Sequence, residues 1–143
     1  FTVYGPRNRP DMAVYKFGDG IYHQRPISVF GDGNSKRDYT FVGDITRAIE
    51  HVLDSDIPFE IFNLGNHHPV RLKDLIHSIE SELEQKAVIK NTAWPKSDPL
   101  TTFAGISKAK RLLGWKPKTP LKKGIRKFAQ WYLKQRNPTE SKK

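Results

Sequence analysis

The hydrophobic positions of the chain alternate between short apolar runs and longer stripes of helical period. Apolar residues spaced by three and four predict five helices, over 10–22, 44–53, 72–83, 107–113 and from 119 onward. Short β-branched and aromatic runs predict extended segments at 1–4, 26–30, 39–42, 59–64 and 87–90. Strands that alternate with helices indicate an α/β fold.

Polar and small residues set the expected helix ends. We expect Asp44 and Ser107 to be N-caps, and Pro10 to occupy the first turn of the helix over 10–22. Gly18 and Gly20 weaken the second half of that helix by about 1 kcal/mol each relative to alanine. The helix that begins at Asp44 is expected to bury a stripe made of Ile45, Ala48, Ile49, Val52 and Leu53.

Length and composition fit one globular unit. The chain has 143 residues, of which 36% are hydrophobic and 28% charged, which is enough to build a core. We expect one domain over 1–136 and a polar tail over 137–143. No apolar run reaches the length of a membrane span, and the lack of cysteine excludes disulfides and favours a cytoplasmic location.

The net charge of +10 raises the alternative of a nucleic-acid binder. Much of the positive excess lies from Lys108 to Lys143, on the polar faces of two predicted helices and in the tail. Charge runs of this kind usually solvate a helix face. We therefore expect nucleic acid to be a less suitable partner than an anionic small molecule.

Basic and aromatic residues are interleaved in the first 37 residues, which is a suitable combination for a nucleotide diphosphate. The same residues would also serve as surface charges and core aromatics, and composition does not decide between these readings. The basic positions are Arg7, Arg9, Lys16, Arg25, Lys36 and Arg37, and the aromatic ones are Tyr4, Tyr15, Tyr22 and Phe30.

Several catalytic signatures are missing from the sequence. There is no GxGxxG dinucleotide fingerprint, no phosphate-binding GxxxxGK loop, and no tyrosine followed four residues later by lysine. The neighbouring His67 and His68 diverge and have no thiolate or carboxylate set beside them, so we expect no metal site. We therefore assign no catalytic residue to this chain.

Four blocks carry a resemblance to a known family: FTVYGPRNRPDMAVYKF at 1–17, RPISVFGDGNSKRDYTFVGDI at 25–45, FNLGN at 62–66 and TTFAGISKAKRLLGWKP at 101–117. In order and spacing they resemble the C-terminal portion of extended short-chain dehydrogenases that act on nucleotide sugars. The RPDMA version is most similar to UDP-glucuronate 4-epimerases. The resemblance extends to about Leu133.

The resemblance implies a small substrate domain together with edge elements of a Rossmann sheet, without the N-terminal Rossmann domain that binds NAD and carries the catalytic Tyr and Lys. The intact enzyme would epimerise UDP-glucuronate at C4 through a 4-keto intermediate. This chain alone would bind a UDP-sugar without NAD and would be inactive. The implied substrate-binding residues are Thr2, Arg9, Lys16, Val29, Phe30, Arg37 and Asp98.

Each of these positions has an implied contact. Thr2 would meet the sugar or diphosphate, Arg9 the sugar carboxylate, and Lys16 and Arg37 the diphosphate. The strand that includes Val29 and Phe30 would flank the uracil. Asp98 would accept hydrogen bonds from the ribose hydroxyls.

Two alternatives stay open. One is a fragment of a related nucleotide-sugar dehydratase or epimerase, and the other is a non-catalytic basic binding module on the same scaffold. The expected partners are a UDP-sugar and the missing Rossmann domain. We also expect self-association through apolar surface and strand edges near 1–4 and 59–64.

Overall fold

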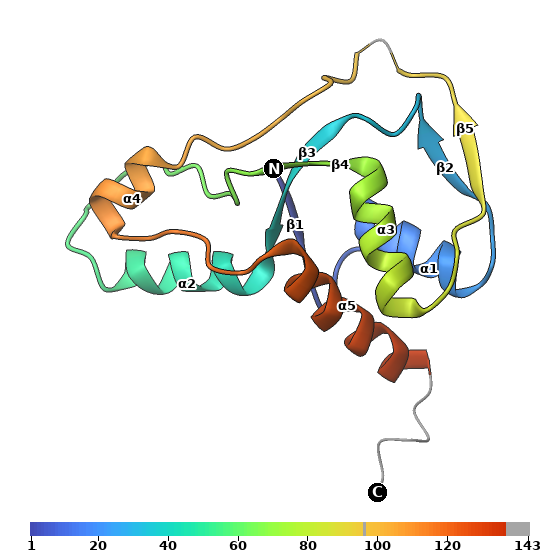
Figure 1. Ribbon diagram of the computed structural model, residues 1–143. Helices are drawn as coiled ribbons and strands as arrows, with labels where there is room; N and C mark the ends of the chain where they lie inside the picture. The colour runs from blue at the N-terminus through green and yellow to red at the C-terminus, as the bar shows by residue number, and fades with distance from the viewer. Residues whose placement is uncertain (96, 137–143) are drawn as a thin grey trace, which may run out of the picture.

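The computed structural model of the protein describes residues 1–95 and 97–136, and it confirms the α/β prediction (Figure 1). The predicted tail over 137–143 lies outside the described residues. The strands are β1 (Thr2–Tyr4), β2 (Ile27–Phe30), β3 (Lys36–Phe41), β4 (Pro69–Arg71) and β5 (Ile89–Thr92). The helices are α1 (Ala13–Tyr22), α2 (Val42–Leu53), α3 (Leu72–Leu83), α4 (Ser107–Leu113) and α5 (Leu121–Arg136).

The strands form two small sheets. In the first, the order is β1-β3-β4, with β1 parallel to β3 and β4 antiparallel to it. In the second, β2 and β5 run parallel, with Phe30 opposite Thr92. Within the described part of the chain, β1 pairs only with β3 and therefore lies at an edge of its sheet.

Two hydrophobic cores hold these elements. The larger core packs α1, α3 and α5 against β3, and its fully buried members include Val14, Leu75, Ile79, Ile125 and Phe128. The smaller core lies between α2 and α4 at the other end of the molecule, around Ala48 and Trp115 (Figure 1). Apolar burial at roughly 25 cal/mol per Å² makes these cores the main stabilising contribution.

Helix α1 begins at Ala13, so the prediction that it starts at Pro10 is wrong; Met12 is its N-cap. Helix α1 ends at Tyr22, as predicted, and the expected weakness of its second half stays a prediction. A Cβ at Gly18 would lie 2.8 Å from Phe128 Cε1, and one at Gly20 would lie 2.4 Å from Ile27 Cγ2. These glycines let α5 and β2 approach α1 closely, and the packing offsets their helix propensity cost.

The segment 59–64 is not a strand, contrary to the prediction. Phe59 is 83% exposed and Ile61 71% exposed, and no strand of the described chain pairs with this segment. An extended segment needs a neighbour to receive its backbone hydrogen bonds, so an apolar pattern alone does not produce a strand here.

The apolar stripe predicted on α2 is largely exposed. Ala48 is fully buried, but Ile49 is 52%, Val52 40% and Leu53 79% exposed. The exposed apolar residues of α2 and of the segment after it, which are Ile49, Val52, Leu53, Phe59 and Ile61, are called here the α2 patch. No helix of the described chain is both long and apolar enough to cross a membrane.

Candidate functional site

A cleft of about 650 Å³ runs along β2, and residues of α1 and β3 also line it. It combines basic, acidic, hydroxyl and aromatic side chains, which suits a ligand with both charged and planar parts. Its polar lining includes Thr2, Lys16, Arg25, Arg37 and Asp98, and its aromatic lining includes Tyr15, Phe30, Tyr39 and Trp94.

An ion pair between β3 and the loop after β5 forms one side of this cleft. Arg37 Nη2 donates to Asp98 Oδ1 at 2.6 Å, while Arg37 Nη1 donates to Lys36 O at 2.9 Å. The loop is tied to β3 because Lys36 N–H donates to Leu100 O at 2.8 Å. The guanidinium therefore keeps a fixed position and still has donors available for an anionic ligand.

An aromatic pair lies where the two parallel strands β2 and β5 end. Phe30, the last residue of β2, is 42% exposed, and Trp94 follows the end of β5 by two residues. Trp94 Nε1 donates to Asp98 O at 3.0 Å. Gly31, at φ +60°, lies next to the indole, since a Cβ built there would be 3.5 Å from Trp94 Cε3. Both rings line the cleft.

Two hydroxyl-bearing residues of the first sheet line the cleft. Thr2 on β1 and Tyr39 on β3 are register partners, so the parallel pairing brings both to the cleft lining. Burial raises the pKa of Tyr39 to about 12, against the smaller opposing effect of the Arg37 charge. The Tyr39 phenol therefore stays protonated at neutral pH and does not act as a base.

Five of the substrate-binding residues that the resemblance implied line this one cleft: Thr2, Lys16, Phe30, Arg37 and Asp98. Their contact with a ligand stays a prediction.

Arg9 and Val29 are not part of the described lining. Val29 is 3% exposed, because its side chain belongs to the larger core and alternates with Phe30 along β2. Arg9 has a side chain that is 73% exposed, and its guanidinium pairs with Asp11 in two hydrogen bonds of 3.1 and 2.7 Å. Asp11 itself lines the cleft, so Arg9 is connected to the cleft through its ion pair with Asp11.

Two buried carboxylates outside the cleft have structural partners. Asp38 on β3 accepts backbone N–H groups from Asn66 at 2.9 Å, His67 at 2.9 Å and Ala104 at 3.0 Å. A Cβ at Gly65 would lie 2.3 Å from Ala104 Cβ and 2.8 Å from Asp38 Oδ2. Close packing around the buried Asp38 carboxyl group thus explains the glycine of the FNLGN block.

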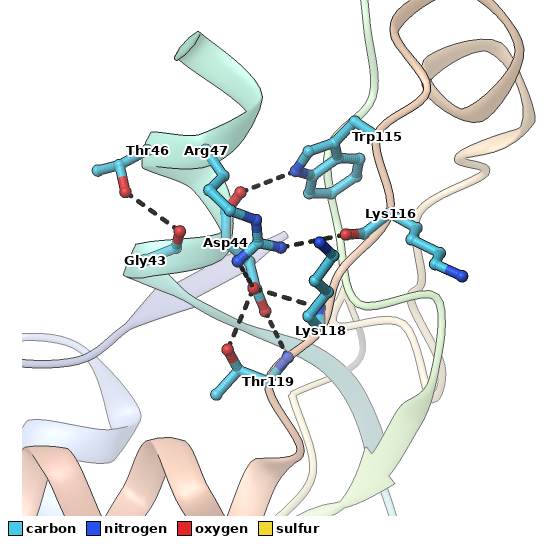
Figure 2. A network of polar contacts seen from close by, with 8 residues as sticks. All are labelled: Gly43, Asp44, Thr46, Arg47, Trp115, Lys116, Lys118 and Thr119. Atoms are coloured by element: carbon cyan, nitrogen blue, oxygen red, sulfur yellow. Dashed lines mark hydrogen bonds and ion pairs between the residues drawn. The ribbon is translucent and has the colours of Figure 1, made fainter. Parts of the chain in front are cut away.

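Asp44 is not the N-cap that the sequence suggested; Phe41 occupies that position and Asp44 lies in the first turn of α2. Its carboxylate accepts hydrogen bonds from the backbone N–H groups of Lys118 at 3.2 Å and Thr119 at 3.0 Å, and from Thr119 Oγ1 at 3.1 Å. Arg47 Nη1 adds a charged donor at 2.6 Å. Figure 2 shows these donors converging on Asp44, which ties α2 to the segment that leads into α5.

Sequence reasoning missed the cleft positions of Trp94 and Asp11. Trp94 follows a predicted strand by a few residues, and a large aromatic just beyond a strand end was the available signal. Asp11 stands next to Pro10 in the RPDM block but offered no signal separate from that block. Within 1–95 and 97–136, no group of three or more His, Cys, Asp and Glu side chains is placed to hold a metal ion.

Comparisons with known proteins agree on one family. A family model described as GDP-mannose 4,6 dehydratase matches residues 1–128. The UDP-glucuronate 4-epimerase of Thermodesulfobacterium geofontis is 39% identical over 132 residues, which cover 92% of this chain and 41% of that protein.

Solved structures agree with this match. The UDP-glucuronic acid 4-epimerase from Bacillus cereus, in complex with UDP-glucuronic acid and NAD, has a TM-score of 0.87 and 31% identity over 94% of this chain and 44% of its own. MoeE5, in complex with the same two ligands, has a TM-score of 0.89 and 25% identity over 94% of this chain and 46% of its own. The chain therefore spans less than half of the length of these proteins.

The residues present do not fit NAD. The sequence has no glycine-rich fingerprint, and α1 follows the segment GPRNRPDM, whose single glycine lies well before the helix begins.

The family model, the sequence relatives and the solved structures all match nearly the whole chain, which corresponds to less than half of the larger proteins. The chain belongs to the extended short-chain dehydrogenases that epimerise or dehydrate nucleotide sugars, and it is a C-terminal portion of that fold.

Proposed function

We propose that this chain is the UDP-sugar-binding part of a nucleotide-sugar 4-epimerase, with UDP-glucuronate as its sugar nucleotide. The observation that carries the proposal is the cleft in which the Arg37–Asp98 pair lies beside the aromatic residues Phe30 and Trp94. A nucleotide sugar needs such a combination of donors for phosphate, acceptors for hydroxyls and a planar apolar surface.

We assign the residues of the cleft as follows. The guanidinium of Arg37 and the ammonium of Lys16 bind the diphosphate, and Thr2 donates its hydroxyl to the diphosphate or the sugar. Asp98 accepts hydrogen bonds from the ribose hydroxyls while it keeps Arg37 in place. The β2 strand end at Val29 and Phe30 flanks the base, with Val29 contributing through its backbone because its side chain is buried.

The preference for glucuronate rests on Arg9. Asp11 lines the cleft and its carboxylate occupies the guanidinium fork of Arg9. A sugar carboxylate has the same shape and charge as the Asp11 side chain, so it can replace Asp11 as the partner of Arg9. Epimerase relatives of the T. geofontis and B. cereus type support this choice of sugar.

Catalysis requires a second part that this chain does not contain. The known family chemistry at C4 passes hydride to and from NAD, and an NAD-binding Rossmann half would supply both the dinucleotide and the acid–base residues. The contribution of the present chain is to bind and orient the sugar nucleotide. We therefore treat residues 1–136 as one substrate domain that acts together with such a half.

The surface on which this Rossmann half docks includes the α2 patch and the open edge of β1. Ile49, Val52 and Leu53 are exposed apolar residues at helical spacing on α2, and Phe59 and Ile61 are exposed apolar residues in the segment after it. Large contiguous apolar surfaces and unpaired strand edges mark sites of association. Without the Rossmann half, the same surface is expected to cause self-association.

Calorimetric titration tests the proposed ligand. The chain should bind UDP-glucuronate more tightly than UDP-glucose, and Arg9→Ala should remove that difference without changing the affinity for UDP. Arg37→Gln should weaken all three ligands by roughly tenfold or more, since a hydrogen bond to a charged group contributes about 1.5–3 kcal/mol. A folded chain that binds none of the three would contradict the proposal.

The net charge of +10 favours one alternative, a module that binds polyanions. Its affinity for nucleic acid would fall steeply with salt and would not respond to UDP. Competition between UDP-glucuronate and a labelled oligonucleotide at two salt concentrations separates the two functions.

Light scattering tests the expected self-association. The wild-type chain should form dimers or larger species, and Leu53→Lys together with Phe59→Lys should return it to a monomer. A monomeric wild-type chain would count against the docking surface.

A further inference from the structure

We propose that Trp94 is a stacking surface for the base of the bound nucleotide, which makes it a further specificity-determining residue of the cleft. The inference rests on the proposed function, because it requires a nucleotide in the cleft. Contacts with neighbouring residues hold the Trp94 indole in place.

The position of Trp94 follows from the second sheet. Strands β2 and β5 run parallel, so their carboxyl ends meet at one edge, and Phe30 and Thr92 are partners in register at that edge. The backbone continues the pairing one step further, since Gly31 N–H donates to Thr92 O at 2.9 Å. Phe30 and Trp94 leave the sheet from neighbouring strand ends and both line the cleft.

The indole is held by its own ring nitrogen. Trp94 Nε1 donates to Asp98 O at 3.0 Å, and the turn is closed because Asp98 N–H donates to Pro95 O at 3.1 Å. Gly31, which follows β2, lies close to the ring: a Cβ added at Gly31 would be in ordinary van der Waals contact with Trp94 Cε3. A polar tip that is already satisfied leaves the apolar faces of the ring free to pack on a planar group.

The same turn connects the indole to the phosphate-binding side of the cleft. Asp98 accepts the Trp94 ring N–H through its carbonyl and pairs with Arg37 through its carboxylate. An aromatic surface and a guanidinium are thus linked through one residue, Asp98, as a nucleoside diphosphate requires for its base and its phosphates. Trp94 is half-buried, which leaves part of its ring accessible to a ligand.

Other tryptophans of the chain lie elsewhere and provide controls. Trp115 is 1% exposed in the smaller core, and Trp131 packs against Tyr15 and Phe128 on α5. Neither is among the residues that line the cleft. A change in tryptophan fluorescence on nucleotide binding should therefore come from Trp94.

The experiment measures UDP binding to the full chain and to Trp94→Leu, Trp94→Phe and Trp131→Phe, by calorimetry and by fluorescence. We expect Trp94→Leu to weaken UDP about tenfold, which is the loss typical of one stacked base. Trp94→Phe keeps an aromatic ring but lacks the ring N–H, so we expect its affinity to stay within about threefold of wild type. UDP should quench the fluorescence of wild type and of Trp131→Phe, but not that of Trp94→Phe.

Four results would overturn the proposal. Unchanged affinity in Trp94→Leu would remove Trp94 from the site while leaving the proposed function intact. Equal weakening in Trp94→Leu and Trp94→Phe would show that the hydrogen bond to Asp98, and not stacking, is what matters. Quenching that persists in Trp94→Phe would locate the nucleotide away from this ring. A folded wild-type chain that binds no UDP would overturn both this inference and the proposed function.

Discussion

Removal of the Asp44 carboxylate should destabilise the protein far more than removal of an exposed carboxylate on the same helix. Asp44 is fully buried, and its side chain satisfies two backbone N–H groups, the Thr119 hydroxyl and the Arg47 guanidinium. In Asp44→Ala the backbone donors of Lys118 and Thr119 lose their acceptor, and Arg47 loses its only acidic partner among the described contacts.

The magnitude follows from these lost partners. A buried donor left without an acceptor costs about 1–3 kcal/mol, and breaking a buried ion pair by removing one partner costs about 3–5 kcal/mol. The contributions overlap because Arg47 is partly exposed, so we expect Asp44→Ala to lower the free energy of unfolding by about 3–5 kcal/mol. That is a large part of the roughly 5–15 kcal/mol typical of a domain. Asp44→Asn keeps one carbonyl acceptor and should cost less.

Urea denaturation followed by tryptophan fluorescence measures this difference. Trp115 Nε1 donates to the backbone oxygen of residue 44 at 2.9 Å, a bond that the side-chain substitution leaves possible. Asp54→Ala, at the exposed C-terminal end of α2, is the matched control and should change stability by less than about 0.5 kcal/mol. A loss below about 1 kcal/mol in Asp44→Ala, with an unchanged denaturant slope, would refute the reasoning.

Three further predictions concern other parts of the molecule. Gly65→Ala should lower the free energy of unfolding by about 1–3 kcal/mol because the added Cβ would clash, whereas Gly105→Ala, with nothing within 4 Å of its Cβ, should change it little. Equal stability losses in thermal denaturation would contradict this prediction. Asp11→Asn should release Arg9 and tighten UDP-glucuronate binding by up to about fivefold, which corresponds to the free energy of an exposed ion pair, and it should leave the affinity for UDP-glucose unchanged. Equal gains for both ligands in calorimetry would argue against competition by Asp11. The pKa of Tyr39 is raised to about 12, against 10 in the unfolded chain, so the unfolded state loses the phenol proton first and the free energy of unfolding should fall by about 2–3 kcal/mol between pH 10 and pH 12. Chemical denaturation across this range should show a shallower fall in Tyr39→Phe.

Local patterns predicted those elements whose packing partners lie within the chain. Helix α3 runs over the predicted 72–83 because its apolar stripe faces α1 and α5, and the C′ position of α4 falls at Gly114 with φ +61°. The segment 59–64 has an equally clear apolar pattern, but a pattern does not show whether a pairing strand is present. The strand β4 was missed because three residues, Pro69–Arg71, carry too short a signal.

The candidate site was predictable to the extent that the family blocks were readable. Thr2 and Lys16 lie in the first block, Phe30 and Arg37 lie in the second, and Asp98 lies outside the four blocks; they meet in one cleft only after folding. For Arg9, the residue type predicts that the side chain binds a carboxylate, but it does not predict that the carboxylate is that of Asp11, because this pairing depends on the geometry of the loop. Asp44 likewise has the residue type of a helix cap, yet burial and four donors give it a different role.

The closing of the larger core by α5 has a consequence for synthesis of the protein. Tyr4 OH donates to Leu121 O at 3.2 Å across 117 residues of chain, and Tyr132 OH donates to Asp19 across 113. At about 5–20 residues per second, a ribosome needs roughly 6–23 s to make the chain between Tyr4 and Leu121. Strand β1 and the inner face of α1 remain without α5 throughout that interval. The apolar surface that α5 covers is therefore exposed on the nascent chain until the last helix has emerged.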